Sequence, residues 1–414
     1  MYYYNRYVYQ LKEFSVNFAS KIATGLGRVE TKFINRMIYG IIKGQSAMLS
    51  EIGRALKETI ALKDTIDRLG KNLEHIFDFI PKIWLNYYDT IRHKIVKGTI
   101  VNFDFSDVIK AKGKKYEDLD KVADGSDEHK VKSGYWVAEA TALIDERVTS
   151  LYSVIFSTLS KGFKSINDEM FKALDQIYKA FGNITTVVGD RGFDDQKIFK
   201  YFLDKAWEFI IRVSHADRLI FYNGIKMKLE DLANTFKGKY NIKIKLKGKM
   251  YNAKCSFAKI MLPGLDKELT VVFVFYDKSV SMFITNQDVL GKHTCLKVVA
   301  SYYKRWRIEE YFKYKKQQFA FEKFMVRSLK RINALNTLLS MALSCIEIIT
   351  RHQTKMLKFI KIEAKSIKTT VFFEYYRVAS GIKNILGHSI SGIDSFFVKQ
   401  DSLQLSLFEN FAET

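Results

Sequence analysis

Residues 184 to 190 read ITTVVGD, and this run sets the fold at the centre of the chain. Its β-branched and apolar residues predict a short strand that is covered on both faces and ends at Gly189 and Asp190. A helix is expected before it, over residues 163–181, and a helix over 194–205 and a strand over 207–213 are expected after it. This alternation predicts a mixed α/β sheet with helices on its faces.

Strands are also expected earlier in the chain, at residues 99–105 and 134–143. Residues 148–159 are apolar and fit either a third strand or a buried helix. The first of these strands ends at Asp104, in the run VNFD. If it lies parallel to the strand before Asp190 and next to it, both aspartates lie at the same end of the sheet, where α/β proteins usually place their functional sites.

Changes in periodicity divide the rest of the chain. Residues 214–300 alternate apolar and polar residues and predict an inserted, mainly β unit, and long helices are expected at 296–318 and 328–355. Two short amphipathic helices within residues 46–73 fit a helix-turn-helix reader of DNA or an ordinary helical bundle. The expected organisation is a helical N-terminal DNA-binding region (1–98), the first part of the α/β core (99–213), a β-rich insertion (214–300), a core helix with Glu309 (301–330) and a helical C-terminal region (331–414).

The chain of 414 residues has a formal net charge of +22. Such self-repulsion is tolerated more readily when the usual partner is a polyanion, so nucleic acid or an anionic membrane surface fits, as does a merely basic exterior. Cys255, Cys295 and Cys345 lie far apart and form no CxxC pair, which indicates a reducing compartment. Residues 332–350 are too polar for a comfortable membrane span and predict a buried helix. We therefore expect a cytoplasmic protein.

A polar stripe is expected on the helix that follows the insertion. At about 100° per residue, four side chains spaced by 3, 4 and 7 residues fall within roughly 60° of one another. They are Tyr302, Arg305, Glu309 and Lys316. Trp306 and Ile308 are expected to point into the core. The stripe fits a metal-binding carboxylate beside groups that bind phosphate, or a solvated face with ordinary i,i+4 ion pairs.

The expected topology brings Asp104, Asp190 and Glu309 together. Clustered carboxylates suit Mg²⁺, a hard cation that prefers oxygen ligands and keeps substrate phosphates in its shell. Two such ions can activate an attacking water or 3′-hydroxyl and stabilise the leaving oxygen of an in-line displacement. Each of the three has an acidic neighbour that competes for its role, namely Asp107, Asp194 and Glu310. Strand position favours the two chosen aspartates, and the spacing of the stripe favours Glu309.

The segment YYKRWRIEEYFKYKK, at residues 302–316, resembles the YREK signature of insertion-sequence cut-and-paste transposases, which are DDE transposases. DFSDVIK at 104–110 resembles the family's first-aspartate segment, and VVGDRGF at 187–193 resembles its second. The resemblance covers about residues 99–330. It implies an α/β fold class: an RNase H-like mixed sheet with flanking helices, interrupted by a mainly β insertion, with helical N- and C-terminal regions.

The resemblance implies a role for each matching residue. The metal ligands, for two Mg²⁺ ions that Mn²⁺ can replace, would be Asp104, Asp190 and Glu309. The contacts to the phosphates of the transposon end would be Tyr302, Arg305 and Lys316. The implied activity is metal-dependent cleavage at transposon ends and strand transfer, on double-stranded DNA with terminal inverted repeats and on target DNA. The implied assembly is a homodimer in a synaptic complex. The implied location is the nucleoid in the cytoplasm, and no membrane partner is implied.

The insertion has a row of lysines on one face of an expected strand. These are Lys243, Lys245, Lys247 and Lys249, in the run IKIKLKGK. They fit a contact with the DNA backbone, and equally the protection of an edge strand against pairing with other chains. Some relatives stack a flipped base on an insertion tryptophan during a hairpin step. Residues 214–300 contain no tryptophan, so the sequence does not support that step here.

Two other functions stay open at this stage. A nuclease or a domesticated recombinase would share the core without transposing, and the absence of terminal inverted repeats beside the gene would favour it. A catalytically inactive DNA-binding protein is the other alternative. Such a protein has no need of three converging carboxylates, whose negative charge repels phosphate. The carboxylates therefore favour an enzyme.

Overall fold

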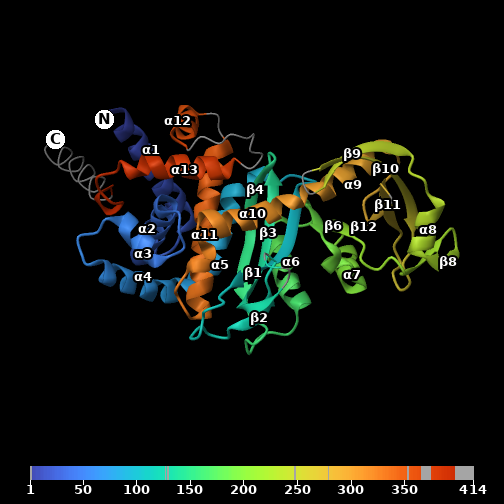
Figure 1. Cartoon of the computed structure of the whole chain (residues 1–414), viewed down its shortest axis with the longest axis horizontal. Helices are drawn as coiled ribbons and strands as arrows, with labels where there is room; N and C mark the ends of the chain where they lie inside the picture. The colour runs from blue at the N-terminus through green and yellow to red at the C-terminus, as the bar shows by residue number, and fades with distance from the viewer. Residues whose placement is uncertain are drawn as a thin grey trace, which may run out of the picture.

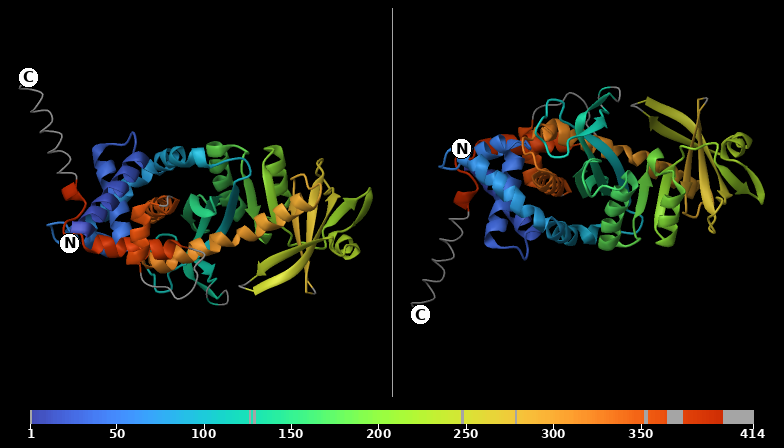
Figure 2. Two further views of the ribbon diagram at one scale, coloured as in Figure 1. Left: turned by 90° about the horizontal axis from the view of Figure 1, so that it is seen from above. Right: turned by 90° about the horizontal axis from the view of Figure 1, so that it is seen from below.

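The computed structural model describes residues 2–396 apart from 126, 128, 129, 247, 248, 278, 352, 353 and 365–373. The molecule is elongated, with helices from both ends of the chain at one end, a sheet in the middle and the inserted strands at the other end (Figure 1). Helices α9 (Lys292–Lys304) and α10 (Trp306–Gln318) form a long rod that spans from the inserted strands to the helical end (Figure 2).

The N-terminal part is helical, as expected. Its elements are α1 (Tyr2–Ile22), α2 (Arg28–Gly44), α3 (Leu49–Leu56), α4 (Leu62–Ile76) and α5 (Ile80–Ile91), with the short 3-10 turns η1 (Phe77–Phe79) and η2 (Arg92–Lys94). α3 packs against α4, and both α2 and α4 contact the C-terminal helix α11 (Leu329–Arg351). The two-helix segment that fits a DNA reader is therefore also part of a helical bundle.

The central sheet has the strand order β4-β3-β1-β5-β6. Its strands are β1 (Ile100–Ile109), β3 (Val131–Ile144), β4 (Arg147–Phe156), β5 (Thr186–Gly189) and β6 (Glu208–Arg212), and a short β2 (Asp120–Ala123) pairs with the start of β3. β1, β3 and β4 pair antiparallel, whereas β5 and β6 continue from β1 in parallel. α6 (Ile166–Phe181) and α7 (Gln196–Asp204) connect these strands. This order is that of an RNase H-like core, and the expected fold class is confirmed.

Helix α6 shows how the sequence sets such boundaries. The Ser165 hydroxyl caps the helix by accepting a hydrogen bond from the backbone N–H of Asp168 at 3.1 Å. Leu174 and Ile177 are fully buried, as the helical period predicts. Gly182 ends the helix with a φ of +66°, which glycine adopts without the penalty that a Cβ would bring.

The insertion continues the central sheet instead of forming a sheet of its own. β12 (Ser279–Thr285) pairs antiparallel with β6, and β11 (Leu269–Tyr276), β10 (Lys249–Ile260) and β9 (Tyr240–Leu246) follow outwards. The other elements are a hairpin of β7 (Leu219–Tyr222) and β8 (Ile225–Lys228) and the helix α8 (Leu229–Thr235). The segment is mainly β, as expected, and its last residues belong to α9.

The part after the insertion is helical. Besides α9, α10 and α11 it contains η4 (Phe321–Lys323), α12 (Lys355–Glu363) and α13 (Tyr375–Gly387). α11 is long and apolar enough to cross a membrane, but 89% of its most apolar window is buried inside the protein. It packs along β4 and against α2, so it is a core helix, as the polar residues in its sequence indicate.

Three boundaries refine the expectations. β1 continues to Ile109, so Asp104 lies in the middle of the strand and not at its end, because residues 105–109 go on pairing with β3. The helix expected at 296–318 consists of two helices that meet at Arg305. Residues 148–159, which fitted a strand or a helix, lie mostly in β4.

Candidate active site

Two parallel strands bring Asp104 and Asp190 close to each other. In the pairing of β1 with β5, Asn102 lies opposite Val188, so each aspartate lies two positions further along its own strand direction. Asp190 follows directly after β5, whereas Asp104 is still within β1. The expectation that the two strands are parallel neighbours is confirmed.

The third carboxylate, Glu309, comes from α10, and Arg305 links it to the sheet. One guanidinium nitrogen of Arg305 donates to the carboxylate of Asp104 at 2.8 Å, and another donates to Glu309 at 2.7 Å. The side chains of Arg305 and Asp104 are only 14% and 19% exposed, so their contact is shielded from bulk water. One cation thus bridges two carboxylates from different elements.

Burial and crowding together disfavour the ionised form of Asp104. Burial raises the pKa of Asp104 to about 7, and the carboxylates of Asp190 and Glu309 add to the rise while Arg305 opposes it. Burial also lowers the pKa of Arg305, but the same three carboxylates outweigh that effect and raise it. The three carboxylates therefore form one electrostatic unit that a cation stabilises.

The chain turns sharply at Asp190. Its carboxylate accepts a hydrogen bond from the backbone N–H of Gly192 at 2.8 Å, which fixes the short 3-10 turn η3 (Arg191–Phe193). A Cβ at Gly189 would lie 2.4 Å from the ring of Phe193, which is buried. Glycine at this position therefore lets Phe193 pack under the end of β5 and keeps Asp190 half-buried beside the sheet.

Arg305 is the junction between α9 and α10. Its N–H donates to the carbonyl of Tyr302 at 2.9 Å, and its carbonyl accepts from the N–H of Ile308 at 3.0 Å. These i to i+3 bonds mark a tighter turn within the rod. Ile308 is fully buried, as expected, but the expectation for Trp306 was wrong, because its side chain is 48% exposed. The ammonium of Lys313 lies 5.6 Å from the centre of its ring, a contact that suits a surface aromatic side chain.

The other stripe residues lie in two different environments. Tyr302 is buried and packs on Phe283 of β12, with ring centroids 4.2 Å apart. Lys316 lies at the far end of α10, where its ammonium is 2.8 Å from Asp107 and 3.3 Å from Glu322. α10 therefore runs beside β1, with Arg305 near Asp104 at one end and Lys316 near Asp107 at the other.

The competing carboxylate Asp194 has structural partners. Its side chain is fully buried and accepts hydrogen bonds from the backbone N–H groups of Ser214 and His215, at 2.7 and 2.9 Å. It also forms an ion pair with Arg218 at 2.6 Å. These contacts fix the start of the insertion relative to the turn after Asp190.

A buried ion pair attaches α10 to the sheet. Lys315 and Glu139 are both fully buried, with the ammonium 2.8 Å from the carboxylate. Lys315 also contacts Ser153 and Asn336, both at 3.0 Å. Glu139 lies directly opposite Asp104 in the pairing of β3 with β1, so the pair holds the helix beside the strand of Asp104. This pair could not be predicted from the sequence, because a lysine in FKYKK is typical of a solvated side chain and nothing nearby in the sequence indicates its partner.

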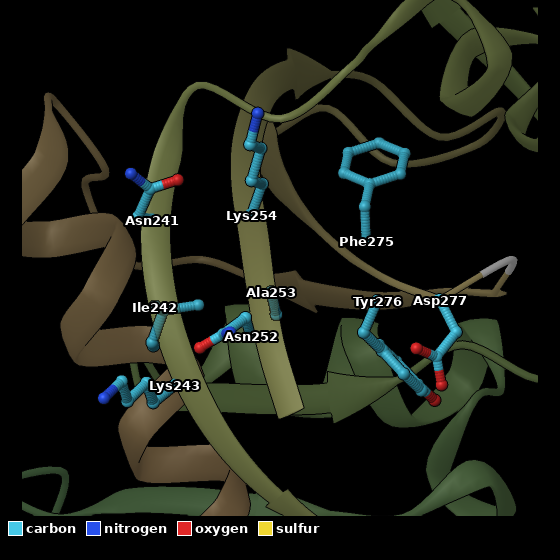
Figure 3. Close-up of a pocket in the computed structure, with 9 residues that line it drawn as sticks. All are labelled: Asn241, Ile242, Lys243, Asn252, Ala253, Lys254, Phe275, Tyr276 and Asp277. Carbon is cyan, nitrogen blue, oxygen red and sulfur yellow. The ribbon is translucent and has the colours of Figure 1, made fainter. Parts of the chain in front are cut away.

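Of the row of lysines in the insertion, Lys243 borders a pocket of about 720 Å³ on the outer strands, together with Lys254 (Figure 3). Lys243 of β9 is exposed and pairs in register with Asn252 of β10, and Lys254 lies two positions further along the same face of β10. β9 is the last strand of the sheet, the position in which lysines also guard against edge pairing. The side chain of Lys245, and the whole of Lys247, lie outside the described residues.

Hard divalent cations fit the chemistry of Asp104, Asp190 and Glu309, because such cations prefer carboxylate oxygens. In the described part of the chain, no three His, Cys, Asp or Glu side chains are arranged closely enough to hold a metal ion as they stand. Arg305 bridges Asp104 and Glu309, so its guanidinium supplies the positive charge there. A metal ion held by all three carboxylates would share Asp104 and Glu309 with this guanidinium or displace it.

Similarity to known proteins identifies the family of this chain. The sequence profile of the family described as Transposase DDE domain matches residues 106–345, which is 240 of the 414 residues. No curated protein matches the chain. A cryo-EM structure of a piggyBac transposase synaptic complex with hairpin DNA is similar over 97% of this chain and 82% of that chain, with 10% sequence identity and a TM-score of 0.48. Because the family profile spans more than half of the chain, the protein belongs to the transposases with a DDE domain.

Proposed function

We propose that Asp104, Asp190 and Glu309 are the catalytic residues of this DNA transposase and that they bind two Mg²⁺ ions. Enzymes of this family cut and transfer DNA and use divalent metal ions. The observation that carries the proposal is the position of the Arg305 guanidinium. It forms ion pairs with Asp104 and Glu309, and the negative charge of Asp190 also raises its pKa. Three carboxylates from two strands and one helix therefore share a site that requires positive charge.

Each residue has a separate part in the proposed mechanism. Asp104 and Asp190 ligate from the sheet, and Glu309 ligates from the helix. The bound ions would activate the attacking water or 3′-hydroxyl and stabilise the leaving oxygen. Arg305 would bind a DNA phosphate beside the carboxylates, since a guanidinium can form two parallel hydrogen bonds with it.

Further contacts with DNA are proposed for Tyr302, Lys316 and Lys243, and for Lys245 and Lys247. Tyr302 lies one helical turn before Arg305, whose backbone N–H donates to the Tyr302 carbonyl at 2.9 Å, and this supports a place for the Tyr302 hydroxyl near the same phosphate. Lys316 would exchange its carboxylate partners for phosphate, and Lys243 is already exposed on the insertion. Each lysine contact to a phosphate adds about 0.9 to the dependence of log affinity on log salt concentration.

The proposed substrate is double-stranded DNA with terminal inverted repeats, followed by target DNA, and the proposed assembly is a homodimer that holds two ends. The support is the resemblance of YYKRWRIEEYFKYKK to the signature of cut-and-paste transposases. The same resemblance supports action at the nucleoid, in the cytoplasm. Light scattering of the protein with a terminal-repeat duplex tests the assembly, for which we expect two chains and two duplexes in one complex. A complex of one chain with one duplex would contradict it.

Glu309→Gln and Glu310→Gln form a matched pair of variants for testing the site. Both replace a carboxylate by an amide of the same shape on the same turn of α10. We expect Glu309→Gln to bind a duplex with the repeats that flank the gene, but to lose metal-dependent cleavage, because an amide is a poor Mg²⁺ ligand. We expect Glu310→Gln to retain cleavage.

Binding by fluorescence anisotropy and cleavage on sequencing gels measure the two steps separately. Cleavage by Glu309→Gln at the wild-type rate would refute the assignment of Glu309. Loss of cleavage only in Glu310→Gln would transfer the role to its neighbour. The reaction products distinguish a transposase from the alternative, a nuclease. A nuclease would cut the duplex but would not join the cut end to a target duplex.

A further inference from the structure

A basic groove lies just beyond the end of β1. It has a volume of about 850 Å³ and opens between the loop after β1, residues 110–116, and the segment 322–327 after α10. Five basic side chains around it point out of these two segments and are exposed. They are Lys112, Lys114, Lys115, Lys323 and Arg327. None of the five belongs to the stripe on α10 or to the row of lysines in the insertion.

The base of the groove is fixed by Lys110. Its side chain is buried, and its ammonium donates to the carbonyl oxygens of Glu322 and Phe324 at 2.5 and 2.6 Å. The same ammonium lies 3.5 Å from the centre of the Phe324 ring. The hydroxyl of Tyr116 donates to the Phe324 carbonyl at 3.0 Å. The loop is therefore tied to the opposite wall at both of its ends, which holds in place the backbone that carries Lys112, Lys114 and Lys115.

Within the part of the chain that the structure describes, no ion pair neutralises the five cations of the groove. Among the described residues, no acidic side chain forms an ion pair with any of the five, although Lys316 and Lys132 nearby are both paired. Two acidic residues, Glu322 and Asp124, also line the groove. The carboxylate of Glu322 pairs with Lys316 and accepts from the backbone N–H of Ile109, and the carboxylate of Asp124 pairs with Lys132. A fixed cluster of unpaired cations repels itself and is stabilised by a polyanion.

The groove is close to the proposed catalytic carboxylates. Its edge, at Glu322, contacts Lys316, and Lys316 contacts Asp107 on β1. Along β1, the distance from Asp104 to Ile109 is roughly 17 Å at 3.4 Å per residue. That length corresponds to about five base pairs of duplex DNA. A duplex that runs beside β1 from the carboxylates would therefore reach the groove.

We propose that this groove binds the sugar-phosphate backbone of the transposon-end duplex, about five base pairs inside the cleavage site. The inference rests on the proposed function. The repeat side of the duplex is favoured over the flanking side by a second hollow, of about 370 Å³, that shares Met48, Met325 and Arg327 with the groove. This hollow reaches α3 and α4, the helices that fit a DNA reader, so one duplex can contact both regions.

The test is a triple variant, Lys112→Gln with Lys114→Gln and Lys115→Gln. A matched control removes the same charge elsewhere, on α6 and α7, by Lys179→Gln with Lys197→Gln and Lys200→Gln. All six lysines are exposed, so both proteins are expected to fold, which circular dichroism checks. Binding to a fluorescent duplex with the flanking repeat is measured by anisotropy over a range of salt concentrations. The groove variant should lower the salt slope by about 2 to 3, and the control should leave it unchanged.

A second pair of duplexes locates the contact. One keeps the full repeat and a short flank, and the other keeps the flank but only about three base pairs of repeat, too short to reach the groove. The difference between the wild type and the groove variant should be present on the first duplex and absent on the second. The proposal would be overturned if the wild type and the groove variant differed equally on both duplexes. It would also be overturned if they differed only on an unrelated target duplex. Absence of cleavage by the wild type would instead count against the proposed function, because binding in the groove is measured without it.

Discussion

Replacing Lys315 by methionine tests the ion pair that holds α10 on the sheet. Methionine has a similar unbranched length, so the change removes the ammonium while largely filling its space. The loss leaves Glu139 fully buried without the contact at 2.8 Å, and the contacts to Ser153 and Asn336 at 3.0 Å are lost as well. Breaking a buried ion pair from one side costs about 3–5 kcal/mol. We expect the free energy of unfolding to fall by this amount.

The double variant Lys315→Met with Glu139→Gln shows whether the stranded charge causes the loss. In the wild type the hydroxyls of Ser150 and Ser153 donate to the carboxylate of Glu139 at 3.2 and 2.7 Å. An amide at position 139 can still accept from Ser150 through its oxygen and can donate to the hydroxyl oxygen of Ser153 through its nitrogen. We therefore expect the double variant to be more stable than Lys315→Met by at least about 2 kcal/mol. Urea unfolding followed by circular dichroism measures both values, with the exposed Lys313→Met as a control that stays within about 1 kcal/mol of the wild type.

Two results would refute this reasoning. A loss below about 1 kcal/mol in Lys315→Met would mean that the buried ammonium contributes no more than a surface lysine. Additive losses in the double variant would mean that Lys315 and Glu139 act independently, so that their contact does not hold α10 beside the strand of Asp104.

Three further predictions concern Asp194, Arg305 and Lys110. Asp194→Asn should lower the free energy of unfolding by about 3 kcal/mol, because it breaks a buried ion pair. Metal-dependent cleavage should persist at temperatures below the lowered melting temperature. Complete loss of cleavage by the folded variant would assign metal binding to Asp194. Arg305→Gln leaves the carboxylates of Asp104 and Glu309 without their cation. The melting temperature in Mg²⁺ should therefore exceed that in EDTA by more in this variant than in the wild type. An equal rise in both proteins would contradict the bridging role of Arg305. Burial lowers the pKa of Lys110 from 10.5 to about 8, so between these pH values the unfolded chain holds a proton that the folded chain has released, and stability should rise with pH. Between these pH values the free energy of unfolding of the wild type should rise by up to about 3 kcal/mol relative to that of Lys110→Met. If urea unfolding gives a difference between the two proteins that does not change with pH, the lowered pKa of Lys110 is contradicted.

The sequence was sufficient to place Asp104 and Asp190, because both depend on local patterns joined by a general rule. A short strand with covered faces can be read from ITTVVGD, and parallel neighbours align the residues that follow them. Only the length of β1 was underestimated. The residues after Asp104 are partly polar, and pairing with β3, which lies later in the chain, is what keeps them in the strand.

The contacts of the stripe could not be predicted from its spacing. Intervals of 3 and 4 residues fix angles around a helix, but they do not show what faces each side chain. Tyr302 turned out to pack against the insertion, Arg305 to bridge two carboxylates, and Lys316 to pair with Asp107. The break at Arg305 also has no sequence signal, because neither glycine nor proline is present there.

Long-range pairing decided the features that the sequence did not reveal. Lys315 and Glu139 are 176 residues apart, and no local pattern distinguishes them from solvated charges. The insertion was expected from its alternation, but its continuity with the central sheet depends on the pairing of β12 with β6, which is also a long-range contact. The basic groove likewise joins two segments that are more than 200 residues apart in the sequence.

The most direct test of the central claim is cleavage of labelled duplexes that carry the inverted repeats nearest the gene, in Mg²⁺, in Mn²⁺ and in EDTA. The three carboxylates predict nicks at the repeat boundary that require either metal, stop in EDTA and disappear in Glu309→Gln. Duplex that is bound but remains uncut by the wild-type protein in both metals would contradict the account.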